Sequence, residues 1–130
     1  MTENKVLDKL MDFIGGFIKD IKVEEIKSTN TFIGSNGATP LQRTIKKGIY
    51  IVQGYTAFGT DKPNIVINSS ILEGGNTIAT TKGTMAAGGG QTVTAIIKAK
   101  NDDTLLRYSL FGYTGENLTA TNVIRILKIK

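Results

Sequence analysis

The feature that most constrains the fold of this chain is a series of strand-length runs that begins at Val23. The runs are rich in Thr, Ile and Val, and clusters of Gly, Asn, Asp and Pro separate them at the spacing of an antiparallel sandwich. No helix-length segment lies between them, so they lack the long crossovers that a parallel sheet needs. The pattern therefore predicts an all-β domain over residues 23–130, built as a sandwich, a jelly roll or a barrel.

Eight segments of this region are predicted strands. Gly48–Phe58 is the strongest of them. The closing segment Asn122–Lys130 carries apolar residues on both faces, which is typical of a central or interfacial strand. The other predicted strands are Ile26–Ile33, Gln42–Ile45, Asn64–Leu72, Thr77–Thr81, Gln91–Lys100 and Thr104–Tyr113.

Residues 1–22 have a helical period instead. Apolar residues recur at spacings of 3, 4, 3 and 4, which is the a/d seam of a heptad. Gly15 and Gly16 interrupt the pattern, and each costs about 1 kcal/mol relative to Ala in a helix. We expect one short amphipathic helix that serves as a trimerisation helix or an anchor, and a lid on its own domain is the alternative. The oligomerisation seam consists of Leu7, Leu10, Ile14, Phe17 and Ile21.

The chain contains no Cys and no His. Disulfides, thiolate nucleophiles, imidazole bases and nearly all structural zinc sites are therefore excluded. The pair Asp102–Asp103 is interpreted as a turn, because Asp bonds its own backbone readily and no third acidic residue lies nearby. We expect a non-enzymatic protein with no cofactor and no metal site.

The net charge of +5 comes from 16 Lys and Arg residues against 11 Asp and Glu residues. Neither a basic face nor interleaved aromatic residues stand out, so we expect no nucleic-acid partner. No window approaches the ~18 consecutive apolar residues that a membrane-spanning helix needs, and no signal-peptide cleavage site follows residues 6–18. Five of the cations lie near predicted strand ends: Lys98, Lys100, Arg125, Lys128 and Lys130.

Several short motifs, in order, resemble those of the complement C1q and tumour-necrosis-factor-like jelly rolls. Lys47–Val52, followed by Ala57–Phe58, is similar to the family's strand of glycine, a hydrophobic residue and tyrosine. Asn101–Asp102 departs from the family, which has Gly-Asp-Thr there. The resemblance covers residues 40–130 and implies a compact homotrimer about a threefold axis, commonly set on a fibre or stalk. Three further segments look like family strands: Asn64–Asn68, Thr92–Lys98 and Ile124–Ile129.

This resemblance, together with the composition and the short N-terminal segment, favours a phage virion protein. We expect a trimeric fibre head or capsid decoration protein that joins other capsid or tail proteins through residues 1–22. The alternative is a bacterial secreted or cell-surface binding module of similar fold. Tyrosines could form a stacking surface for a host surface glycan, although tyrosines in sandwiches more often fill the edge of a core. The predicted contact residues are Tyr55, Asp61, Tyr113, Glu116 and Asn117.

Overall fold

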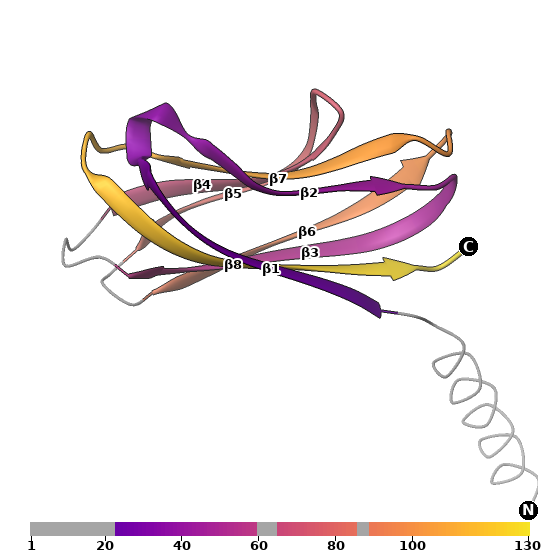
Figure 1. Cartoon of the computed structure of the whole chain (residues 1–130), viewed down its shortest axis with the longest axis horizontal. Helices are drawn as coiled ribbons and strands as arrows, with labels where there is room; N and C mark the ends of the chain where they lie inside the picture. The colour runs from indigo at the N-terminus through magenta and orange to yellow at the C-terminus, as the bar shows by residue number, and fades with distance from the viewer. Residues whose placement is uncertain (1–22, 60–64, 86–88) are drawn as a thin grey trace, which may run out of the picture.

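The computed structural model describes residues 23–59, 65–85 and 89–130, and these residues form eight strands and one short 3-10 turn (Figure 1). The helix predicted over residues 1–22 and the predicted contact residue Asp61 lie outside the described residues. The elements are β1 Val23–Ile33, the 3-10 turn Gly34–Asn36, β2 Ala38–Ile45, β3 Gly48–Gly59, β4 Ile65–Glu73, β5 Asn76–Met85, β6 Gly90–Ala99, β7 Thr104–Gly112 and β8 Asn117–Lys128.

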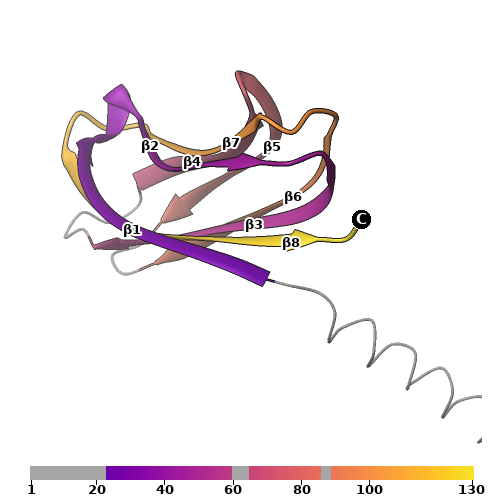
Figure 2. The same cartoon turned by 45° about the vertical axis from the view of Figure 1, so that its right-hand side comes forward.

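The strands form two four-stranded antiparallel sheets that lie one above the other (Figures 1 and 2). We call them the first sheet, with the order β1-β8-β3-β6, and the second sheet, with the order β2-β7-β4-β5. Only the link from β4 to β5 stays within one sheet, and every other connection crosses to the opposite sheet. Eight strands in this order make a jelly roll, which confirms the predicted all-β antiparallel sandwich.

The core lies between the sheets, and alternation along each strand places side chains in it. Every second residue of β6 and β7 is buried, as the period of two in a strand requires. Val52, Ile71 and Leu106 are completely buried. Since burial of apolar surface contributes about 25 cal/mol per Å², these aliphatic side chains are the main source of stability.

A buried polar network crosses this core. The Tyr108 hydroxyl from β7 lies 2.5 Å from Oγ1 of Thr56 on β3, and Thr56 donates to Oδ1 of Asn122 at 2.8 Å. Tyr108 also bonds Ser69 of β4, which accepts a hydrogen bond of 2.9 Å from Nε2 of Gln91 on β6. The network therefore ties the two sheets together and gives partners to the buried hydroxyls and to Nε2 of Gln91, while Oε1 of Gln91 has no hydrogen-bond partner among the described residues.

Strand β8 differs most from its predicted bounds. It begins at Asn117 rather than at Asn122, because the segment from Asn117 pairs with β1, where Asn117 lies opposite Ile33. It lies between β1 and β3, which confirms the predicted central position. The predicted turn at Asp102 is also confirmed, and its Oδ1 accepts a hydrogen bond of 3.1 Å from the backbone of Lys47.

Candidate functional site

The predicted glycan-contact tyrosines lie on opposite sides of the molecule. Tyr55 projects from β3 on the outer face of the first sheet and is 42% exposed. Tyr113 follows β7 at the outer face of the second sheet and is 52% exposed. The other two tyrosines, Tyr50 and Tyr108, are buried in the core. The four rings therefore do not form one stacking surface.

Tyr113 belongs to a small cluster on the second sheet. Its ring meets the ring of Phe111 edge to face, with centroids 4.9 Å apart. Nζ of Lys82 lies 4.6 Å from the Tyr113 ring centroid, and Nδ2 of Asn68 donates to its hydroxyl at 3.1 Å. An aromatic face with an ammonium and an amide beside it has the chemistry to contact a sugar.

The two remaining predicted contact residues lie in or beside the turn from β7 to β8. The backbone oxygen of Glu116 accepts a hydrogen bond of 3.0 Å from Gly34, and its backbone N–H donates to Oγ1 of Thr114 at 3.3 Å. Asn117 is exposed at the start of β8. The turn is thus held against the link from β1 to β2.

Aliphatic side chains cover part of the outer face of the first sheet, a feature that the sequence analysis did not locate. In the register of the sheet, Leu127 of β8 lies opposite both Val23 of β1 and Ile51 of β3, and Ile51 lies opposite Ile96 of β6. Val23 is 59% exposed and Ile96 is 68% exposed. We call this row, with its neighbours Ile49 and Ile129, the apolar surface. It extends across all four strands of the sheet.

The apolar surface has a charged border on one side. Arg125 of β8 pairs with Glu25 of β1 at 3.0 Å, and Lys27 reaches the same carboxylate at 3.1 Å. The pKa of Glu25 is lowered, first by its hydrogen bond to the Arg125 guanidinium and then by Lys27. The Glu25 side chain is solvent-exposed, so these ion pairs contribute little to stability.

The outer face of the second sheet carries a row of hydroxyl groups besides the Tyr113 cluster. Hydroxyl groups pair across its strands at 2.9 Å, Thr39 with Ser109 and Ser70 with Thr80. Ser70 and Ser109 are register partners, so the four hydroxyls form a row across the sheet. This row of hydroxyls suits water or a polar ligand, whereas the apolar surface of the first sheet suits an apolar partner.

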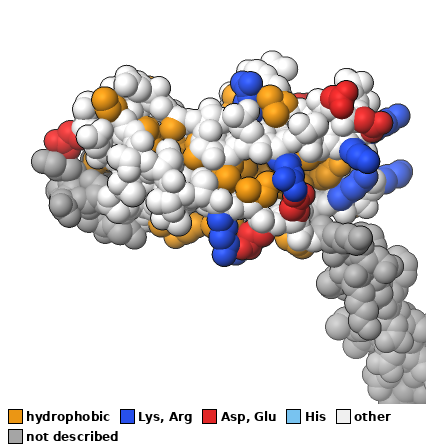
Figure 3. Space-filling view, viewed as in Figure 1, with side chains coloured by type: hydrophobic (Ala, Val, Ile, Leu, Met, Phe, Trp, Pro, Cys, Tyr) orange, Lys and Arg blue, Asp and Glu red, His pale blue; other side chains and the backbone are white. Residues whose placement is uncertain are grey.

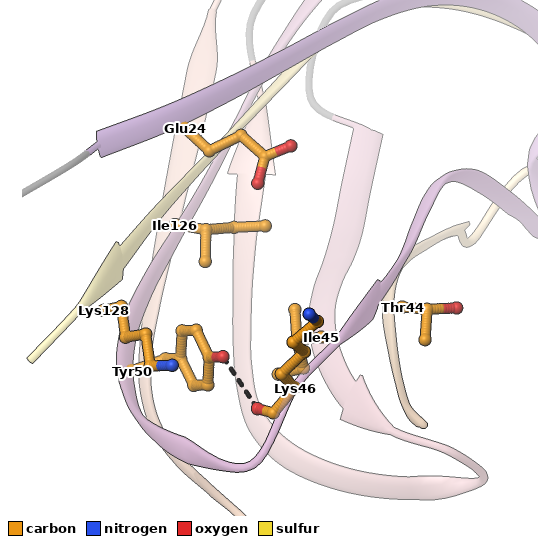
Figure 4. A pocket seen from close by; sticks show the side chains of 7 residues that line it. All are labelled: Glu24, Thr44, Ile45, Lys46, Tyr50, Ile126 and Lys128. Carbon is orange, nitrogen blue, oxygen red and sulfur yellow. Dashed lines mark hydrogen bonds between the residues drawn. The ribbon is translucent and has the colours of Figure 1, made fainter. Parts of the chain in front are cut away.

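A pocket of about 290 Å³ opens between the sheets at the end near the C-terminus (Figure 4). The Tyr50 hydroxyl donates to the backbone oxygen of Lys46 at 2.7 Å, and Nζ of Lys128 lies 5.9 Å from the Tyr50 ring centroid. Glu24 at the rim is ion-paired with Arg43 of β2. The lining residues are Glu24, Thr44, Ile45, Lys46, Tyr50, Ile126 and Lys128.

Several blue Lys or Arg side chains, with red carboxylates beside them, lie at this same end of the sandwich (Figure 3). A second hollow, of about 450 Å³, lies there, and we call it the lysine groove. The three cations at this groove were not grouped by the sequence analysis, because they come from three separate segments. The groove is lined by Lys47, Gly48, Ile49, Lys98, Ala99 and Lys130.

Backbone contacts hold Lys130 at the groove. Ile49 donates to the backbone oxygen of Lys130 at 3.0 Å, and Ile129 donates back to Ile49 at 2.8 Å. The close approach depends on Gly48, which has φ 155°, and a Cβ there would lie 2.5 Å from the Lys130 oxygen. The C-terminal residue is therefore fixed beside β3.

Metal-binding groups of side chains and helices that could cross a membrane are both absent from the described part of the chain. Within it, no group of three or more His, Cys, Asp or Glu residues could hold a metal ion. Among the same residues, no helix has the length and apolar character to cross a membrane. Its chemistry consists of an apolar surface, an aromatic cluster and a groove lined by cations.

No protein-family model matches the chain, and no curated protein sequence matches it. Its fold is similar to that of solved jelly-roll structures. The capsid protein VP2 of infectious bursal disease virus, in a subviral particle, matches 84% of the chain with a TM-score of 0.61 and 12% identity. The chain spans about a third of that protein, since the match covers 33% of it.

Two other similar structures match most of their own length. A subunit of the disulfide-linked pili called Bacillus endospore appendages has a TM-score of 0.50 and 18% identity, and the match covers 84% of this chain and 89% of that one. The CBM22-1 xylan-binding domain of Paenibacillus barcinonensis Xyn10C has a TM-score of 0.50 and 12% identity, with 85% and 83% covered. At these identities the likeness shows the fold, which defines the chain as a jelly-roll protein.

Proposed function

We propose that this chain is a non-enzymatic structural protein of a virion, a fibre head or capsid decoration that assembles as a homotrimer. The apolar surface is the observation that carries the proposal. Exposed aliphatic residues such as Ile96 and Val23 are unfavourable in water, and a contiguous group of them is typical of a protein interface. The fold likeness to a viral capsid protein supports the same role.

Two features together support the trimer. C1q and tumour-necrosis-factor-like jelly rolls, which the motifs from Lys47 onward resemble, assemble as trimers. The apolar surface reaches Val23, which directly follows residues 1–22 with their predicted seam. Copies that meet at the apolar surface would also bring these segments together, and the anchor would join the trimer to capsid or tail proteins.

The mass of the assembly tests this interface directly. Light scattering should give three times the 14.0 kDa of one chain for the natural protein. The variant Ile96→Lys places a charge in the apolar surface and should give the mass of one chain, with an unchanged circular dichroism spectrum. Thr94→Lys is the matched control, because Thr94 is also exposed on β6 but lies outside the apolar surface. A natural mass near one chain at all concentrations would contradict the trimer.

The virion location needs a separate experiment. Virus particles purified by density gradient from the source culture should contain peptides of this chain in a fixed ratio to the major capsid protein, measured by mass spectrometry. Peptides found only in a cell-surface or filament fraction would contradict the virion role. They would support the alternative, a bacterial surface module.

The alternative also has a specific observation in its favour. The pilus subunit and the xylan-binding domain match this chain over most of their own length, whereas the viral capsid protein matches over a third. In either role, the cluster around Tyr113 is the proposed glycan contact. Tyr113→Ala should remove binding on a glycan array, while Tyr55→Ala on the opposite face should keep it.

A further inference from the structure

The lysine groove gathers like charges that the rest of the domain does not neutralise. Lys47 lies in the link between β2 and β3, Lys98 lies on β6, and Lys130 follows β8. Among the described residues, no carboxylate forms an ion pair with any of the three side chains. Cations that converge on one hollow repel each other and create a positive potential, which attracts anions.

Charges around the groove add to this potential. Lysines outnumber carboxylates at this end, even when the turn aspartates are counted. Six lysines and Arg43 against four side-chain carboxylates leave a difference of +3 (7 − 4 = 3). One of these carboxylates, that of Asp102, also accepts a backbone hydrogen bond from Lys47. The residues counted are Arg43, Lys46, Lys47, Lys98, Lys100, Lys128, Lys130, Glu24, Glu73, Asp102 and Asp103.

The floor of the groove is apolar. Ile49 and Ala99 line it together with Gly48, which has no side chain. A small inorganic anion would use the lysines and leave this floor uncovered. A peptide with an aliphatic side chain between carboxylates would use both the lysines and the floor. Its aliphatic side chain would cover the floor, and its carboxylates would lie at the rim beside the lysines.

The groove is also continuous with the apolar surface. Ile49 belongs to both, and in the register of the sheet it lies opposite Lys98. A bound chain can therefore run from the lysines onto the aliphatic row. None of the residues that line the groove is aromatic, whereas single-stranded nucleic acid is bound through aromatic stacking.

We propose that the lysine groove binds an acidic peptide segment of a partner protein, with an aliphatic side chain of the peptide over Ile49 and Ala99. The carboxylates of the peptide pair with Lys47, Lys98 and Lys130. This inference goes beyond the proposed function, because the binding requires neither the trimer nor the virion.

The probe is a fluorescent hexapeptide with alternating Glu and Leu residues, titrated with the full-length protein and followed by anisotropy and amide NMR shifts. Binding should shift the amides of Gly48, Ile49 and Ala99. Each of Lys47→Gln, Lys98→Gln and Lys130→Gln should weaken it about threefold, and the triple variant at least tenfold, since exposed charge pairs contribute 0.2–1 kcal/mol each in typical cases, roughly a 1.4–5-fold change. Added salt should weaken it further.

Lys27→Gln is the matched control, because Lys27 is an exposed lysine on β1, at the opposite edge of the first sheet from β6, and its loss should leave the affinity unchanged. A peptide with Gln in place of Glu should not bind. Three results would overturn the proposal: no shift at the groove amides, equal affinity for an oligo-dT strand or inorganic phosphate, or full affinity in the triple lysine variant. Each of these outcomes is independent of the oligomeric mass.

Discussion

At the scale of single residues, the contact between Gly54 and Tyr108 determines how the sheets pack. The Tyr108 ring from the second sheet lies directly against Gly54 of β3 in the first. A Cβ at position 54 would lie 2.8 Å from Cδ1 of the ring, a separation that real Cβ atoms do not tolerate. The glycine thus makes room for the largest of the fully buried side chains.

Gly54→Ala should therefore destabilise the domain. The added methyl group must displace the Tyr108 ring, and overpacking of this kind costs about 1–3 kcal/mol. Urea unfolding followed by fluorescence measures the change. Gly59→Ala in the same strand is the control, since nothing lies within 4 Å of a Cβ there. Equal stability of the two variants would show that the ring has room to move.

The Tyr108 hydroxyl links stability to pH. Burial raises its pKa above the ordinary value of 10.0, although hydrogen bonds with Thr56 and Ser69 lower it in part. The folded state therefore holds this proton more tightly than the unfolded state does. The resulting stability is fully present below pH 10.0 and is lost as the pH rises through the folded pKa.

Tyr108→Phe separates this effect from the titration of other groups. At about pH 8 the variant should be less stable by about 1–3 kcal/mol, because Thr56 and Ser69 lose a buried partner. Above pH 10.0 the difference in the free energy of unfolding should shrink, since only the natural protein loses the contribution of this hydroxyl. A difference that stays constant through the alkaline range would contradict the assignment.

At the scale of elements, the edge strand β1 depends on a buried side chain of its neighbour. Nδ2 of Asn122 on β8 donates to Oδ1 of Asn30 at 2.8 Å and to Oγ of Ser28 at 3.3 Å. Asn122 is fully buried, and its own oxygen accepts from Thr56. One amide therefore connects the edge strand to the core network.

Asn122→Leu should loosen β1 more than the rest of the sandwich. The variant keeps the size of the side chain but leaves Thr56 without its acceptor and β1 without two hydrogen bonds, at a cost of about 1–3 kcal/mol. Hydrogen exchange should become faster at residues 27–31 than in β4 and β7. Thr121→Val is the control, because this exposed neighbour faces the other side of β8. Uniform faster exchange in all strands would contradict a local role.

The strands were predictable from the sequence because their signals are local. Alternation and turn residues placed most strands within a few residues of their bounds, and β8 began early only because the turn chemistry at Asn117 resembles a loop. Strand order was not predictable from periodicity, since pairing joins residues as distant as Val23 and Leu127. The apolar surface and the lysine groove were not predictable either, because each combines side chains from separate strands.

Local signals at these surfaces were nevertheless present. The closing strand is apolar on both faces, and Ile96–Ile97 places one isoleucine in the core and one outside. Lysines near strand ends were noted from the sequence, but Lys47 joins Lys98 only through the pairing of β3 with β6. Such convergence depends on register, which a single sequence does not specify.

At the scale of the whole molecule, the eight described strands share one hydrophobic core. The described core residues come from both sheets, and the polar network joins them without a contribution from outside the strands. A jelly roll with such a core should fold without residues 1–22. Those residues are then free to act between molecules, as the proposed trimer requires.

Removal of residues 1–22 tests this division of roles. The shortened chain should keep its unfolding midpoint within a few degrees, because its core is unchanged, but light scattering should show single chains in place of trimers. The full-length double variant Leu10→Glu and Phe17→Glu is the matched control, since it charges the predicted seam without changing the length. Both proteins should lose the trimer alike. A large loss of stability in both, with the natural protein already a monomer, would instead identify residues 1–22 as a lid on the domain.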